Sequence, residues 1–69
     1  MSITFTDKEG NFIKCWPGVE YAEHGIPNVG DHVLLHLGDY NEEVEEYVVL
    51  WRTFDGARPD VVYCTIERV

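Results

Sequence analysis

The sequence predicts an all-β, mainly antiparallel fold in which five strands form a small barrel or a strongly curled sheet. Apolar and polar residues alternate in short runs, which is the pattern of half-buried strands. Glycine, proline and acidic residues separate these runs, as they do at turns. Between residues 27 and 54, two apolar runs flank a polar connector, and this arrangement predicts a β-hairpin.

The chain has 69 residues, and we expect one domain spanning 1–69. A domain of this size buries only about 60% of the surface that its unfolded chain exposes, so modest stability is expected. A hydrophobic content of 45% suits a compact core and argues against disorder. Because a second copy would supply extra burial, the sequence is consistent with a monomer or a homodimer.

The first two strands are expected at Ser2–Thr6 and Asn11–Trp16. In the first strand, Ile3 and Phe5 fall on one face, because side chains alternate with a period of two. The turn between the strands ends at Gly10, a residue that adopts positive φ without a steric penalty. The second strand then returns along the first.

The segment after the second strand is the least regular part of the chain. Pro17 and Gly18 end that strand. A single helical turn is expected at 19–25, where Gly25 can cap its end. Pro27 then favours an extended exit into the next strand.

The third strand is expected at His32–Leu37, with Val33, Leu35 and Leu37 on one face. The fourth, Glu45–Phe54, has apolar residues on both faces, which is typical of a central strand. One face is expected to hold Tyr47, Val49 and Trp51, and the other Val48, Leu50 and Phe54.

The fifth strand is expected at Asp60–Val69, after a loop that begins with the hairpin signal Asp55 and Gly56. Its side chains alternate between the core and solvent. We expect Val62, Cys64 and Ile66 to point inward and Tyr63, Thr65 and Glu67 to point outward.

The start of the third strand carries a short motif, in which Pro27 is followed by Gly30, Asp31 and Val33. This motif resembles the strand opening of the Src-homology-three-like small β-barrels. The resemblance implies a small barrel and no particular activity, because these barrels host many unrelated functions.

The formal net charge of −8 limits the classes of partner. An acidic field repels nucleic-acid phosphates and anionic lipids, so direct nucleic-acid binding is disfavoured and no membrane association is expected. It favours association with basic protein surfaces. Cys15 and Cys64 form no disulfide framework, and no signal peptide is visible, so we expect free thiols and a cytoplasmic protein.

No metal site is expected. His32 and His36 have the spacing of a zinc helix motif, but on a strand they lie about 13 Å apart. A calcium-loop pattern starts at Asp39 and fails where Val44 and Leu50 replace the required glycine and glutamate. The solvated acidic turn is therefore the preferred interpretation.

Catalysis is not expected either, and we assign neither catalytic residues nor a cofactor. Ser2 is the only serine, and neither cysteine has a histidine or a glycine-rich segment beside it. The glycines are scattered among turns, so no phosphate-binding loop is present. A non-enzymatic function is therefore predicted.

The acidic connector, residues 38–46, is the main electrostatic feature, because it holds five of the thirteen acidic residues. We expect a protein-interaction domain that binds a basic protein surface through this connector. The alternative is a nucleic-acid mimic, encoded by a phage or mobile element, that inhibits a DNA-binding protein or nuclease. The expected binding residues are Asp39, Tyr40, Glu42, Glu43, Glu45 and Glu46.

Overall fold

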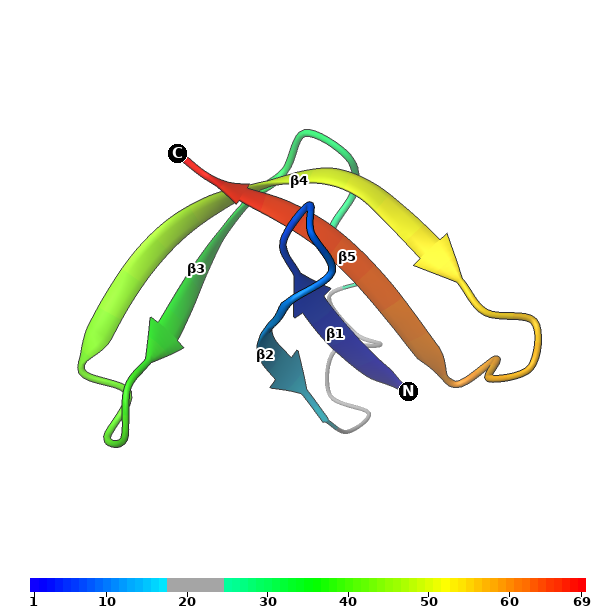
Figure 1. Cartoon of the computed structure of the whole chain (residues 1–69), viewed down its shortest axis with the longest axis horizontal. Coiled ribbons are helices and arrows are strands. Elements are labelled where there is room, and N and C mark those ends of the chain that lie inside the picture. The colour runs from blue at the N-terminus through cyan, green and yellow to red at the C-terminus, as the bar shows by residue number, and fades with distance from the viewer. Residues whose placement is uncertain (18–24) are drawn as a thin grey trace.

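The computed structural model describes residues 1–17 and 25–69. These residues form one sheet of five strands, and the helical turn expected at 19–25 lies almost entirely outside them. Figure 1 shows the strands curling around a shared interior as a half-barrel. The strands are β1 (Ser2–Thr6), β2 (Phe12–Trp16), β3 (His32–Leu37), β4 (Glu43–Phe54) and β5 (Val61–Arg68).

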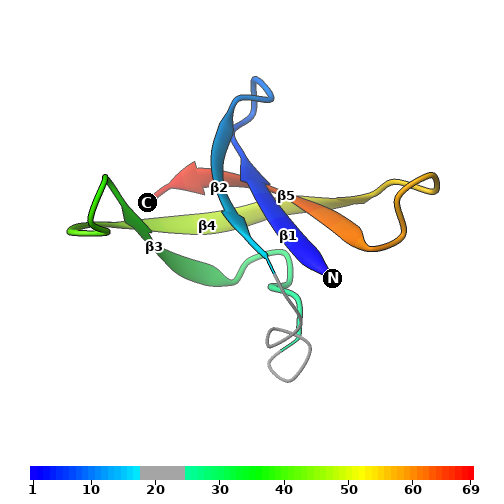
Figure 2. The same ribbon diagram turned by 90° about the horizontal axis from the view of Figure 1, so that it is seen from below.

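The spatial order of the strands is β2-β1-β5-β4-β3. Three neighbouring pairs are antiparallel, and β1 pairs with β5 in parallel. The predicted all-β, mostly antiparallel curled sheet is thus confirmed. The parallel pair joins the first and last strands of the chain. Turn residues in the sequence predict antiparallel hairpins and do not predict such a pairing. β2 and β3 form the two edges and are not paired with each other, so the barrel is open along one seam (Figure 2).

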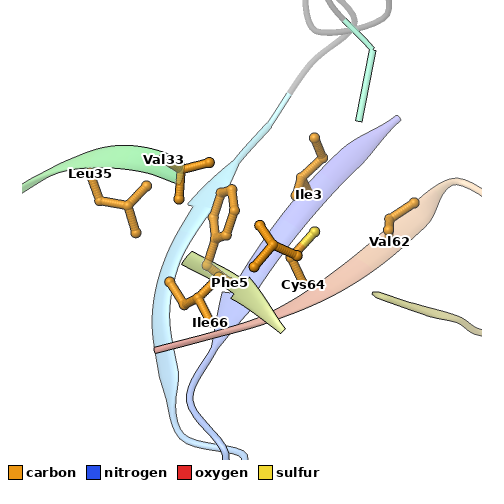
Figure 3. Close-up of a cluster of buried hydrophobic side chains, with 8 residues drawn as sticks. Ile3, Phe5, Val33, Leu35, Val62, Cys64 and Ile66 are labelled. Carbon is orange, nitrogen blue, oxygen red and sulfur yellow. The ribbon is translucent and has the colours of Figure 1, made fainter. Parts of the chain in front are cut away.

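The core lies on the concave face of the sheet, as the alternation of side chains predicts. Ile3 and Phe5 on β1 are 1% and 0% exposed. Val33 and Leu35 on β3 face them across the interior (Figure 3). β5 contributes the three side chains expected to point inward, Val62, Cys64 and Ile66, all buried.

The prediction for the faces of β4 is wrong beyond its middle. The register with β5 shifts between Val49 and Trp51, so Leu50 is an extra residue in a β-bulge. Tyr47 and Val49 pack in or against the core as expected. Trp51 is turned to the convex face and is 48% exposed, because an extra residue reverses the alternation.

Thr65 on β5 also differs from expectation, since it is only 7% exposed although it alternates with core residues. Its neighbours by register are Thr6 on β1 and Trp51 on β4. β5 is the central strand of the sheet, so Thr65 has a neighbouring strand on each side. The Thr65 side chain is therefore buried although the alternation places it on the outer face of the sheet.

Aspartate side chains organise two of the turns, one between β1 and β2 and one between β4 and β5. In the β1–β2 turn, Asp7 Oδ1 accepts hydrogen bonds from the backbone N–H groups of Glu9 (3.0 Å) and Asn11 (2.8 Å). In the β4–β5 loop, Asp55 Oδ1 accepts one from the Ala57 N–H (2.9 Å). Such side-chain bonds satisfy backbone donors that the strands leave unpaired at their ends.

Candidate functional site

Residues 38–42 of the acidic connector form the tip of the β3–β4 hairpin, and residues 43–46 are the first residues of β4. The chain reverses there through two positive φ angles, 86° at Gly38 and 57° at Asn41. The Asn41 N–H donates to the Gly38 carbonyl oxygen (3.2 Å), and the Tyr40 N–H donates to Glu42 Oε2 (3.0 Å). Backbone reversal and a local carboxylate contact therefore shape the loop.

Tyr40 projects from this tip and is 88% exposed, which makes it the most exposed large hydrophobic residue described. Tyrosine is enriched among residues that dominate binding energy, because its ring offers apolar area and its hydroxyl offers a hydrogen bond. The carboxylates around it add negative charge. This combination is suited to contact with a cationic protein surface.

The structure separates the expected binding residues into three groups. Asp39, Tyr40 and Glu42 lie in the turn itself. Residues opposite each other in an antiparallel pair point to the same face. Glu43 and Glu45 lie opposite Leu37 and the buried Leu35, so both are on the concave side. Glu46 lies opposite the exposed Leu34 and is on the convex side.

Intramolecular contacts occupy several of these carboxylates. Glu45 forms an ion pair with Arg68 of β5. Glu46 Oε2 lies 2.6 Å from His32 Nδ1 on β3. Asp39 and Glu43 have no side-chain hydrogen bond or ion pair within residues 1–17 and 25–69. These two carboxylates are consequently the ones most available to a partner.

One cation reaches the connector from the other edge of the sheet. Lys14 on β2 extends its ammonium group to Asn41 Oδ1, at 3.1 Å. The two residues are 27 positions apart, and the sequence analysis singled out neither as part of the site. No local pattern signals this contact, since it depends on how the curled sheet brings β2 towards the tip of the β3–β4 hairpin.

Two hollows border the seam between β2 and β3. The larger, of about 590 Å³, has β2 residues on one side and Leu34 and His36 of β3 on the other, with Asn41 at the connector. The smaller, of about 320 Å³, lies between Trp16 and the segment that leads into β3. This seam was not predicted, because the sequence is compatible with a closed barrel as well as with a curled sheet.

The cysteines are free and lie on opposite faces of the sheet. Cys64 is buried in the core, and burial raises the pKa of its thiol, opposed by the positive charge of Arg52. Cys15 is half-buried, with its sulfur 3.9 Å from the Thr4 hydroxyl. A buried thiol with a raised pKa stays protonated at neutral pH and is a poor nucleophile.

The part of the chain that the structure describes holds neither a candidate metal site nor a candidate membrane-spanning helix. There, no group of three or more histidine, cysteine, aspartate or glutamate side chains is arranged to hold a metal ion. No helix in those residues is long and apolar enough to cross a membrane.

No family model, curated protein or solved structure matches the chain. The acidic connector, with its exposed Tyr40 and its available carboxylates, is therefore the feature from which a function can be argued.

Proposed function

We propose that this chain is a small, non-enzymatic protein-interaction domain that binds a basic protein surface through the acidic connector. The observation that supports this most directly is the exposed Tyr40 ring, which belongs to the same connector as the available carboxylates of Asp39 and Glu43. An aromatic anchor surrounded by charge of one sign provides both contact area and electrostatic attraction. The net charge of −8 extends the same attraction over a longer range.

The intramolecular contacts of each connector side chain indicate what that side chain contributes to binding. Glu45 pairs with Arg68 and Glu46 contacts His32, so these two carboxylates contribute mainly to the shape of the hairpin. Asp39 and Glu43 supply the charge that meets the partner, and Tyr40 supplies the buried contact. Electrostatic attraction acts mainly on the association rate, whereas a buried aromatic residue acts mainly on the dissociation rate.

The test uses two charge variants that each remove two carboxylates. Asp39→Asn with Glu43→Gln alters the connector, and Glu9→Gln with Asp60→Asn removes the same charge at other exposed turns. Binding is measured by surface plasmon resonance against a basic protein captured from the native host. The connector variant is expected to slow association about tenfold at low salt, with thermal unfolding unchanged. Equal slowing by both variants would show that net charge, and not the connector, drives binding.

Tyr40→Ser is the second variant. It is expected to speed dissociation from the same protein by about tenfold or more, as loss of a binding hot spot does. An unchanged dissociation rate would remove Tyr40 from the interface. Competition by duplex DNA for the same basic protein would instead support the nucleic-acid mimic, because a mimic occupies the surface that phosphates occupy.

A further inference from the structure

The free edge of β3 is the second feature of this surface that can bind a partner. β3 is the last strand in the order of the sheet, and residues 1–17 and 25–69 supply no strand beyond it. β2, at the opposite edge, curves past β3 without pairing to it (Figure 2). An edge strand exposes a row of backbone donors and acceptors, which is a template for a further strand.

Backbone hydrogen bonds show which residues of β3 direct their N–H and C=O groups outward. The Val49 N–H donates to the Asp31 carbonyl oxygen, at 2.9 Å, so the backbone carbonyl of Asp31 points towards β4. Backbone groups of successive residues alternate between the two sides of a strand. The N–H and C=O groups of Val33 and Leu35 therefore point towards β4 as well. The backbone N–H and C=O groups of Leu34 and His36 therefore point to the open edge.

A contact on the far side of β4 supports the same assignment. The Val69 N–H donates to the Glu46 carbonyl oxygen (3.0 Å), so Glu46 is directed towards β5. The backbone N–H and C=O groups of Glu45 and Tyr47, on either side of Glu46, must then point towards β3. These two residues lie opposite Leu35 and Val33.

β3 itself lacks a bulge, a proline and a lysine or acidic side chain, features that protect edge strands from other chains. Its register with β4 is regular from His32 to Leu37, and the strand contains no proline, lysine or acidic residue. Leu34, at its centre, is 58% exposed and borders the hollow of about 590 Å³ in the seam. Proline, lysine and bulges are the usual means by which proteins block edge pairing.

The charges around this edge determine which kind of strand fits it. Asp31 precedes β3 and Asp39 follows it, while β4 beside it carries Glu43 and Glu46. Lys14 of β2 lines the seam hollow opposite them, so four carboxylates face one lysine around this edge. A second copy of this chain would bring its own net charge of −8 to the same place. Charge complementarity therefore favours a cationic strand over self-association.

We propose that an extended, basic segment of the partner protein adds to the free edge of β3 as a sixth strand, in the seam between β3 and β2. This inference rests on the proposed function, because it names the form in which the basic partner is bound. Main-chain hydrogen bonds to Leu34 and His36 supply affinity, and side chains of the added strand that meet the connector supply specificity.

The test uses a synthetic peptide of about seven residues, an ordinary strand length, in which lysine and valine alternate. A control peptide has the same number of lysines but proline in place of valine, so it carries the charge without forming a strand. We expect the lysine–valine peptide to bind and to slow hydrogen exchange at the Leu34 and His36 amides at least tenfold, as measured by NMR. The control peptide should bind more weakly and slow neither amide.

A pair of variants separates main-chain from side-chain contacts. Leu34→Pro removes the outward N–H, whereas Leu34→Thr keeps it and shortens the side chain. Because this N–H makes no bond within the sheet, the proline variant is expected to fold, and its affinity for the peptide should fall about tenfold or more. The threonine variant should bind within about threefold of the original chain. The exchange measurement on the unaltered chain decides the matter if the proline variant does not fold.

Each contrary result has a definite meaning. Equal binding of both peptides, with the two amides still exchanging fast, would overturn strand addition and leave the acidic surface as the binding site. Protection of the two amides in the free protein, with self-association in sedimentation, would show that a second copy occupies the edge. Failure of both peptides to bind, together with no effect of the Asp39→Asn and Glu43→Gln changes on the captured protein, would overturn the proposed function too.

Discussion

The two edge strands, β2 and β3, occupy equivalent positions in the sheet and differ in how they are protected. β2 has a bulge at Ile13, where the register with β1 shifts, and it carries Lys14 in its centre. β3 has a regular register with β4 and contains no lysine, arginine, aspartate or glutamate. Bulges and lysines block the approach of another strand. The comparison shows one edge that is shielded by its own sequence and one that is not.

The two edges are also attached to the core differently. β2 is anchored by Trp16, whose ring meets the ring of Phe5 edge-to-face, with centroids 4.7 Å apart at 74°. β3 is anchored by the buried side chains of Val33 and Leu35. A single aromatic contact therefore has more influence on β2 than any one residue has on β3.

The largest expected losses of stability come from shortening the buried side chains that anchor the two edges, one at a time. Phe5→Ala should lower the free energy of unfolding by about 3–5 kcal/mol, and Leu35→Ala by about 2–5 kcal/mol, because both side chains are fully buried. Denaturant unfolding measures both, and Phe5→Leu serves as a milder form of the first change. Hydrogen exchange should then accelerate selectively in β2 for the Phe5 variants. Equal acceleration in β3 would show that the edges are not anchored independently.

Substitutions in the two hairpin turns beside the edges should have the next largest effect. Gly10 and Gly38 both have φ of 86°, so alanine at either position should cost about 1–2 kcal/mol of stability. At Gly38 the added Cβ would lie 3.2 Å from Glu42 Oε1, whereas nothing lies near Gly10. Gly38→Ala is therefore expected to cost more in denaturant unfolding. An equal loss of stability in the two variants would mean that the Glu42 side chain moves away from the added Cβ at no cost in free energy.

The β1–β2 turn should show a pH dependence that comes from Asp7. Backbone hydrogen bonding from Asn11 lowers the pKa of Asp7 below its ordinary value of 3.8. A lowered pKa in the folded state means that Asp7 stabilises the fold at neutral pH and that this contribution is lost as the pH falls through the folded pKa. Asp7→Asn should flatten the fall in melting temperature under acidic conditions.

Asn11→Ala provides the matched control for that experiment. It removes the side-chain donor that lies 3.1 Å from Asp7 Oδ2 but keeps the backbone N–H. The pH dependence should therefore decrease less than in Asp7→Asn. A profile identical to that of Asp7→Asn would contradict the leading role of the backbone hydrogen bond.

The smallest expected effects are those of the surface ion pairs on the two sides of the sheet. Lys8 pairs with Glu67 at 2.8 Å beside the β1–β2 turn, and His32 pairs with Glu46 at 2.6 Å on the β3–β4 ribbon. About half of each of these side chains is exposed, so solvent screens both pairs. Double-mutant cycles should give coupling energies below about 1 kcal/mol for each. A larger value for His32 would mean that the ion pair, as well as the backbone ladder, holds β3 in place.

The sequence by itself determined the five strands, the core faces of β1, β3 and β5, and the position of the acidic connector at a hairpin tip. These features are local, because alternation with a period of two and turn residues act within a few positions of each other. Ile3, Leu35 and Ile66 are buried for this reason.

Only the tertiary structure decided which strands meet and what the edges expose. The parallel β1–β5 pair, the outward turn of Trp51 at its bulge and the reach of Lys14 to Asn41 all join segments that are distant in the sequence. The same is true of the open edge of β3, since a strand is an edge only by virtue of the neighbour it lacks. Local patterns cannot specify such contacts, because their free energy depends on the whole curled sheet.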